Sequence, residues 1–374
     1  MTETATETET SAEDLEHFRD SVRSALAALS GPDRVRAAMA NGGRADGETW
    51  RVLATQLDLA GLMVPEEFGG SGLGPVELAV ALEEAGSALL VSPLFATAAL
   101  AVPLLVALDD PSALARYGPA IAAGTRTATV ALAEDDGEWS LDAVRATARR
   151  DGERWRLDGA KNYVVDGADA GLVLVVARAG ADVAVFAVDD PALPRERLVT
   201  LDLTRPMARL TFESTEATLV GSLGADGAVR SATAVSRALL AAEQVGGAQR
   251  CLDMAVDYAK TRIQFGRPIG SFQAVKQRLA DALVQVESAR SAVYVAVRSA
   301  GADLALNARI AAVLAAEAYA AVSAQNIQLH GGIGFTWEHD AHLYFKRARA
   351  GAQLLGRVGE HITAIGQHLD DKIS

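Results

Sequence analysis

The chain has 374 residues, of which 50% are apolar and 22% charged, so it can bury a sizeable core and is not a disordered chain. Its 35 basic and 48 acidic residues give a formal net charge of -13. No basic patch offsets that charge, so nucleic acid and anionic membranes are poor partners. The single cysteine, Cys251, excludes a disulfide framework and a zinc cluster built on cysteines.

The chain starts with the polar stretch MTETATETETSAEDLEHF, for which we expect a disordered lead-in followed by a helix. This stretch has neither the basic nor the apolar region of a signal peptide. The apolar run over 94–108 is shorter than the roughly 18 apolar residues typical of a membrane span, and it contains Pro103. We therefore expect a soluble, cytoplasmic protein without a membrane segment.

Periodicity predicts a helical block first, from residue 14 to about 108, with helices over 48–59 and 75–85 around a glycine-rich loop. Residues 125–221 then form short runs rich in Val, Thr and Leu, which are typical of strands. The five clearest runs are TATVALA, AVRATARR, ERWRLDG, LVLVVARA and DVAVFAVD, with turns at Asp151-Gly152 and at Gly180.

Helical periodicity returns from about residue 228 to the end of the chain. One long amphipathic helix is predicted from apolar residues at steps of three and four, namely Phe272, Val275, Leu279, Leu283, Val286, Ala289, Val293 and Val297. Because strands and helices do not alternate, the order argues against a doubly wound sheet. We predict a helical domain over 1–120, a central β domain over 121–226 and a C-terminal helical bundle over 227–374.

Three stretches of the sequence, taken together, resemble the acyl-CoA dehydrogenase family of flavoproteins. They are GLMVPEEFGGSGLG with ALEEAG (61–86), YAKTRIQFGRPIGSFQAVKQRLAD (258–281) and IQLHGGIGFTWEHDAHLYFKRA (327–348). Their order and spacing fit that family along essentially the whole chain. The resemblance implies a mostly helical fold with a central β-barrel or sandwich domain and a C-terminal four-helix bundle, FAD as cofactor, and an actinobacterial type of enzyme.

The resemblance also assigns two segments, or arms, that bind FAD. A pyrophosphate calls for an arginine and for backbone N–H groups that can approach closely. In the family both arms reach across a subunit interface to the FAD of a neighbour, which implies an oligomer of like or of related chains. The first arm would be Arg262, Gln264, Phe265 and Gln273, and the second Gln328, Gly331 and Gly332.

Two family segments that seat the flavin ring are altered. Ala133 stands where the family has a threonine before Glu134, and Val165 stands where it has another threonine. Tyr163 replaces a tryptophan and keeps an aromatic ring that could stack on the flavin. The hydroxyl groups that hold the ring in the family are therefore missing here.

Neither family position for the catalytic base holds a carboxylate: Leu355 occupies one of them and Ser236 the other. Glu243 is the remaining candidate, since it lies in an apolar, small-residue segment about two turns after Ser236. A carboxylate in such surroundings has a raised pKa, which suits proton abstraction. The sequence leaves open whether Glu243 is the base or a structural carboxylate.

Other polar residues are weaker candidates. His339 and His342 could share a helix face, but no third metal ligand is evident, so surface roles are expected. Cys251 is interpreted as a small buried apolar residue, and Glu66 with Glu67 as part of a turn.

Three functions follow from this reading. The first is FAD-dependent α,β-desaturation of an acyl-CoA thioester, with electrons passed to an electron-transfer flavoprotein. The second is a catalytically silent subunit that completes the FAD site of a partner chain, as in mixed oligomers of steroid and fatty-acid degradation. The third is an acyl-CoA-binding scaffold without redox chemistry; the acyl group itself stays open.

Overall fold

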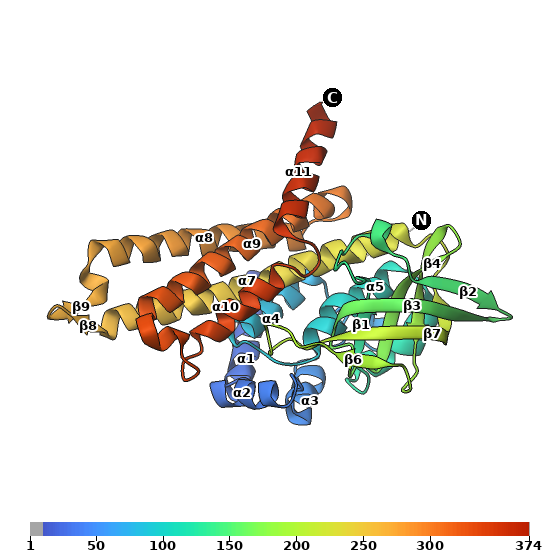
Figure 1. Ribbon diagram of the computed structural model, residues 1–374, viewed down its shortest axis with the longest axis horizontal. Helices are drawn as coiled ribbons and strands as arrows, with labels where there is room; N and C mark the ends of the chain where they lie inside the picture. The colour runs from blue at the N-terminus through green and yellow to red at the C-terminus, as the bar shows by residue number, and fades with distance from the viewer. Residues whose placement is uncertain (1–9, 374) are drawn as a thin grey trace.

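The computed structural model describes residues 10–373 and consists of a helical N-terminal block, a β block and a long C-terminal bundle (Figure 1). Most of the lead-in expected at the N-terminus lies outside the described residues. The N-terminal helices are α1 (Ala12–Leu29), α2 (Pro32–Ala40), α3 (Gly47–Thr55), α4 (Pro75–Ser87), α5 (Val102–Ala107) and α6 (Pro111–Ala122). The C-terminal helices are α7 (Asp226–Thr261), α8 (Gln273–Val297), α9 (Gly301–His330), α10 (Ala341–Gly351) and α11 (Val358–Ile373).

The apolar run over 94–108 is a buried helix, as expected, but its first half is wound as a π-helix, Phe95–Ala101, that continues into α5. Pro103 has no N–H and so cannot donate to the carbonyl four residues before it, that of Ala99. The Ser236 hydroxyl of α7 donates to this carbonyl at 2.6 Å. Ser236 therefore has a structural partner in the fold.

The β block contains β1 (Ala128–Ala131), β2 (Thr147–Asp151), β3 (Arg154–Val165), β4 (Leu172–Ala179), β5 (Asp182–Val188), β6 (Arg195–Arg197) and β7 (Met207–Val220). The five predicted runs are confirmed as β1 to β5, and Gly152 and Gly180 take the positive φ angles of +64° and +68° in the turns. The pairings run β4-β2-β3-β7-β5 and return to β4, so these strands form a closed sheet, as a barrel does. The sequence analysis did not single out β7, although this strand pairs with both β3 and β5.

Helix α8 confirms the predicted amphipathic helix, with one correction. Leu283 was expected on its buried face but is 48% exposed. The buried line of α8 is narrower and passes through Ala282, Val286, Ala289 and Val293. Small residues suffice there because α8 packs closely against α9 and α7, while its other side faces outward (Figure 1).

Helix α9 is the one segment of the described residues that is long and apolar enough to cross a membrane, taken with the turn after it as Gly301–Phe335. The sequence analysis did not single it out. Within the fold it packs against α7, α8, α10 and α11, and its alanines form the contacts. Only 39% of its most apolar stretch is buried, so the contacts with these helices cover part of its apolar surface.

Helices α4 and α7 cross so closely that their backbones touch. A Cβ atom at Gly86 of α4 would collide with the Glu243 carbonyl, and one at Gly246 of α7 would collide with the Glu83 carbonyl. Gly247 faces the other way, where a Cβ atom would meet the ring of Tyr319 in α9. Small residues near Glu243 are thus needed on two sides of α7: Gly246 allows the close contact with α4, and Gly247 leaves room for the Tyr319 ring of α9.

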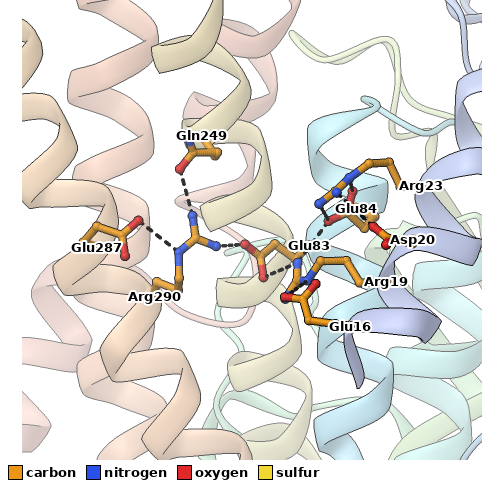
Figure 2. A network of polar contacts seen from close by, with 9 residues as sticks. All are labelled: Glu16, Arg19, Asp20, Arg23, Glu83, Glu84, Gln249, Glu287 and Arg290. Atoms are coloured by element: carbon orange, nitrogen blue, oxygen red, sulfur yellow. Dashed lines mark hydrogen bonds and ion pairs between the residues drawn. The ribbon is translucent and has the colours of Figure 1, made fainter. Parts of the chain in front are cut away.

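A polar network joins the N-terminal block to the bundle beside this crossing (Figure 2). Arg19 of α1 donates to Glu83 and Glu84 of α4 at 3.1 and 3.0 Å. Arg290 of α8 also pairs with Glu83 and donates to Gln249 of α7 at 2.8 Å. Four helices therefore share one set of charges on the flank of the α4–α7 contact.

We predict that Gly246→Ala lowers the free energy of unfolding by about 1–3 kcal/mol, because the added methyl group forces α4 and α7 apart. Urea unfolding followed by circular dichroism measures the change. Gly227→Ala is the matched control in α7, since no atom lies within 4 Å of its Cβ position, and it should be neutral or slightly stabilising. Equal effects of the two substitutions would contradict a tight crossing at Gly246.

Candidate functional site

The first predicted arm is a short hairpin at the end of α7. Strands β8 (Ile263–Gln264) and β9 (Arg267–Pro268) are joined by Phe265-Gly266, both with positive φ angles. A left-handed phenylalanine is uncommon, and this one projects from the tip with 91% of its surface exposed. Arg262, Gln264 and Gln273 are exposed as well.

The second predicted arm is the turn after α9. Gln328 is exposed near the helix end, and Gly331 has a φ angle of +64°. No atom lies within 4 Å of the Cβ positions of Gly331 and Gly332, so the main chain can be approached closely there. This is the property that the binding of a pyrophosphate requires.

The two arms meet at one end of the bundle, where the rings of Tyr258 and His330 stack with centroids 4.3 Å apart. This end lies far from the β block, which carries Tyr163 (Figure 1). The structure therefore places both arms at the same end of the bundle, away from strand β3, which carries Tyr163. The arms fit the pyrophosphate-bearing cofactor that the resemblance implies, but only for a flavin seated on another chain.

The ring seat of this chain departs from the family pattern, as the sequence indicates. Ala133 and Val165 are buried, each with 1% exposure, and neither carries a hydroxyl group. Tyr163 is 38% exposed in a left-handed conformation and lines a cavity of about 280 Å³ together with Trp139, Arg205 and Arg357. An aromatic surface and space are present at this place, without the hydrogen-bonding groups of the family.

Leu355 and Ser236, the two positions that the resemblance assigns to the base, face one small cavity. Its volume is about 20 Å³, which is room for no more than a water molecule. Its lining is otherwise mostly apolar, with Leu100, Leu104, Val130 and Trp139 among the residues. The convergence supports the alignment of both positions, and the cavity offers neither a carboxylate nor space for an acyl chain.

Glu243 is buried, with 6% exposure, between two arginines that the sequence analysis did not connect to it. Arg347 of α10 donates to its carboxylate at 2.5 Å, and Arg205, in the loop before β7, pairs with both of its oxygens. Spacing along α7 could not reveal these partners, because they lie 38 and 104 residues away in sequence. The geometry favours the structural reading of Glu243 over the catalytic one.

Arg347 is the centre of this cluster. Its Nε lies 2.8 Å from Asp202, and its second terminal nitrogen donates to the carbonyl and hydroxyl oxygens of Thr204 at 3.0 and 2.8 Å. Burial lowers the pKa of Arg347, but the charges of Asp202 and Glu243 outweigh that effect and raise the pKa above its ordinary value. Arg347 is therefore a fixed positive charge in this cluster.

A larger cavity of about 420 Å³ lies between the β block and the bundle, and three arginines line it: Arg230, Arg237 and Arg309. Burial, followed by the charge of Arg309, lowers the pKa of Arg237 to about 10. His361 of α11 is buried beside them, and its pKa falls to about 4 through burial and then through the charges of Arg237 and Arg309. Two carboxylates, Glu138 and Glu360, line the same cavity. With three arginines against two carboxylates, the arginine side of the cavity can accept an anion.

The remaining candidates have ordinary roles. Cys251 is buried, and burial raises its pKa, so it is a packing residue as expected. His339 packs against His330, and His342 packs against Trp337 with ring centroids 4.8 Å apart. The surface role expected for His342 is wrong, because this residue is buried with 6% exposure. Within residues 10–373 no group of three or more His, Cys, Asp or Glu side chains could hold a metal ion.

Comparison with known proteins decides the family. The N-terminal domain model of acyl-CoA dehydrogenases matches residues 12–125, and the C-terminal domain model matches residues 226–369. Acyl-CoA dehydrogenase IpdE2 of Mycobacterium tuberculosis is 39% identical over 344 residues, which cover 92% of this chain and 93% of that protein. This chain belongs to the acyl-CoA dehydrogenase family.

Two solved structures are similar to this chain along nearly its whole length. The ChsE4–ChsE5 complex of Mycobacterium tuberculosis matches with a TM-score of 0.88 and 31% identity, over 96% of this chain and 98% of that one. A variant of the Tcur3481–Tcur3483 steroid ACAD matches with a TM-score of 0.87 and 32% identity, over 96% and 99%. The expected fold and the actinobacterial type of the family are thereby confirmed.

We predict that Glu243→Gln lowers the free energy of unfolding by about 3–5 kcal/mol, because it removes the buried counter-charge that Arg205 and Arg347 share and leaves only Asp202 beside Arg347. Denaturant unfolding measures the loss. Glu287→Gln is the control, since its carboxylate is 53% exposed, and it should change stability little. Unchanged stability, combined with a roughly 10²–10⁴-fold slower reduction of bound flavin by an acyl-CoA, would instead identify Glu243 as the base.

We predict that His361 makes the fold sensitive to acid. The folded protein takes up this proton only near pH 4, whereas the unfolded chain takes it up near 6.5, so the contribution to stability is complete above pH 6.5 and is lost as the pH falls toward 4. The free energy of unfolding of His361→Gln should therefore depend less on pH between 7 and 4, by up to about 3 kcal/mol. His17→Gln, at an exposed site, serves as the control, and parallel profiles for the wild type and His361→Gln would contradict the prediction.

Proposed function

We propose that this chain is a catalytically silent subunit of a mixed acyl-CoA dehydrogenase oligomer, in which its two arms complete the FAD site of a related partner chain. The partner would carry the base and desaturate the acyl-CoA thioester. This is the second of the three functions that the sequence leaves open.

The observation that carries the proposal is the state of the chain's own base positions. Leu355 and Ser236 face a cavity of about 20 Å³ that has no carboxylate. The Ser236 hydroxyl already donates its hydrogen bond to the Ala99 carbonyl. The remaining carboxylate, Glu243, is held by two arginines. A substrate thioester would find neither space nor a proton acceptor there.

The arms support the other half of the proposal. All seven arm residues are exposed at one end of the bundle and keep the identities that the family uses toward a neighbour's flavin. The similarity to two structures whose names each join two proteins, ChsE4–ChsE5 and Tcur3481–Tcur3483, agrees with a mixed oligomer. A subunit that completes the FAD site of its partner needs the two arms but needs no catalytic base of its own.

FAD bound at the shared site would accept the hydride from the β-carbon of the thioester, while the partner's base takes the α-proton. Arg262 and the backbone of Gly331 and Gly332 would hold its pyrophosphate. Electrons would leave to an electron-transfer flavoprotein, and the assembly would be cytoplasmic. The similarity to a steroid ACAD favours steroid-derived acyl-CoA substrates over simple fatty acyl chains.

A second function, an active dehydrogenase with its own flavin, is favoured by the 280 Å³ cavity beside Tyr163. That cavity offers an aromatic ring and space. Neither of the two family positions for the base, Leu355 and Ser236, lines it. The purified chain would have to bind FAD and reduce it with an acyl-CoA in the absence of any partner.

The test is co-expression with a related acyl-CoA dehydrogenase chain from the same source, followed by purification through a tag on this chain alone. We predict that Arg262→Ala lowers the FAD content of the mixed oligomer at least about tenfold, because the pyrophosphate loses a charged hydrogen-bond donor. Lys260→Ala is the matched control, an exposed cation two residues away, and should retain the flavin.

Failure of the two chains to co-purify would contradict the proposal. So would a mixed oligomer whose flavin content is indifferent to Arg262. Flavin reduction by the wild-type chain alone would favour the second function instead.

A further inference from the structure

Trp139 lies where three cavities of this chain meet. It lines the arginine cavity of about 420 Å³, the Tyr163 cavity of about 280 Å³ and the apolar cavity of about 20 Å³. No other residue in the described part of the chain lines all three. Its side chain is 9% exposed, so the indole itself fills the space between them.

The loop that carries Trp139 is anchored before this residue, at Glu134. The Glu134 carboxylate accepts the backbone N–H groups of Arg145 and Ala146, each at 2.9 Å, and the Lys161 ammonium at 2.8 Å. Although burial opposes it, these bonds hold the pKa of Glu134 below its ordinary value. The carboxylate therefore stays charged and keeps its hold on the loop.

The loop is fixed on the following side as well. Arg178 donates to the carbonyls of Leu141 and Val144 at 3.1 and 2.7 Å. Between the two anchors, a Cβ atom at Gly137 would lie 3.3 Å from the Tyr163 ring, so the loop also rests on that ring. The indole of Trp139 is thus held in place by the surrounding structure and does not hang from a free loop.

The two spaces that meet at Trp139 have complementary chemistry. The arginine cavity is lined by Arg230, Arg237 and Arg309 and suits phosphate groups. The apolar cavity is lined mostly by apolar side chains, including Leu355. An acyl-CoA is a molecule with phosphates at one end and an apolar chain at the other, joined through the thioester. Four residues line both the arginine cavity and the apolar cavity, namely Leu132, Trp139, Val229 and Thr233, and the indole is by far the largest of these side chains. An acyl-CoA that occupied both spaces would therefore have to displace mainly the indole.

We propose that Trp139 is an internal plug that blocks the acyl chain of a CoA thioester from the interior of this subunit. The proposal rests on the silent role inferred above and deepens it, because it names the residue that excludes the substrate. With the indole present, a CoA thioester can reach the arginines only with its acyl chain left outside.

The experiment measures the affinity of the purified full-length chain for acetyl-, butyryl- and octanoyl-CoA by titration calorimetry. In the wild type the dissociation constant should be the same for all three, or binding should be undetectable. In Trp139→Ala the affinity should rise with acyl length, by up to about fourfold per buried methylene group, and octanoyl-CoA should bind at least about tenfold more tightly than acetyl-CoA.

Three further variants complete the design. Trp139→Phe keeps an aromatic ring at the plug and should behave like the wild type. Leu355→Ala enlarges the apolar cavity without opening the way to it, so alone it should show no length dependence. If Trp139→Ala does not fold, as judged by circular dichroism, Trp139→Leu provides a shorter side chain that still packs against apolar neighbours.

Length-dependent binding by the wild type would overturn the plug, as would the absence of length dependence in folded Trp139→Ala and Trp139→Leu. Either result leaves the role of the arms untouched, since the flavin content of the mixed oligomer tests that role separately. The opposite combination is also distinguishable. If no related chain co-purifies, but binding depends on acyl length only in Trp139→Ala or Trp139→Leu, the plug is supported and the role as a silent subunit is rejected.

Discussion

The three blocks of this protein are joined through the buried carboxylate of Glu243. It lies on α7 at the point where the backbone of α4 touches that helix, and it pairs with Arg205 from the β block and Arg347 from α10. Buried charges are costly to desolvate, and this cost is offset only when each charge keeps its partners in good geometry. The position of α10 relative to the β block is therefore fixed by whether these side chains meet.

That constraint also explains why the interior has little space for chemistry. The α10 helix leads directly into the loop that places Leu355, in a left-handed conformation, against Ser236. The glycines of the α4–α7 crossing bring the N-terminal helices down onto the same region. The cavity at the two base positions, Leu355 and Ser236, is thereby reduced to about 20 Å³.

Elements with a local sequence pattern could be predicted from the sequence. Features that depend on contacts between residues far apart in the chain could not. The amphipathic period of α8 and the Asp151-Gly152 turn are local signals, and both were read correctly. The alanine-rich α9 shows no single apolar face, because it is covered on several sides, so its period carries no comparable signal. The exposure of Leu283 could not be foreseen either, since the period of a helix marks an apolar face but not how much of it a neighbour covers.

The candidate site follows the same rule. Each arm is a contiguous motif and can be singled out in the sequence, whereas the arginines that hold Glu243 come from two other parts of the chain. Trp139 stood within the altered LAEDDGEWS stretch, and a large aromatic residue among small polar ones was the available signal. Only the fold shows that this indole adjoins the cavity of Leu355 and Ser236.

The two departures from the family, a missing base and a filled interior, reinforce one another physically. An empty apolar cavity costs stability in proportion to its volume, so under the proposed silent role a chain without substrate would gain stability by filling the space with Leu355 and Trp139. The arm residues are exposed and contribute little to the core of their own chain. Under the same proposal their function would lie in the contact with a neighbouring chain.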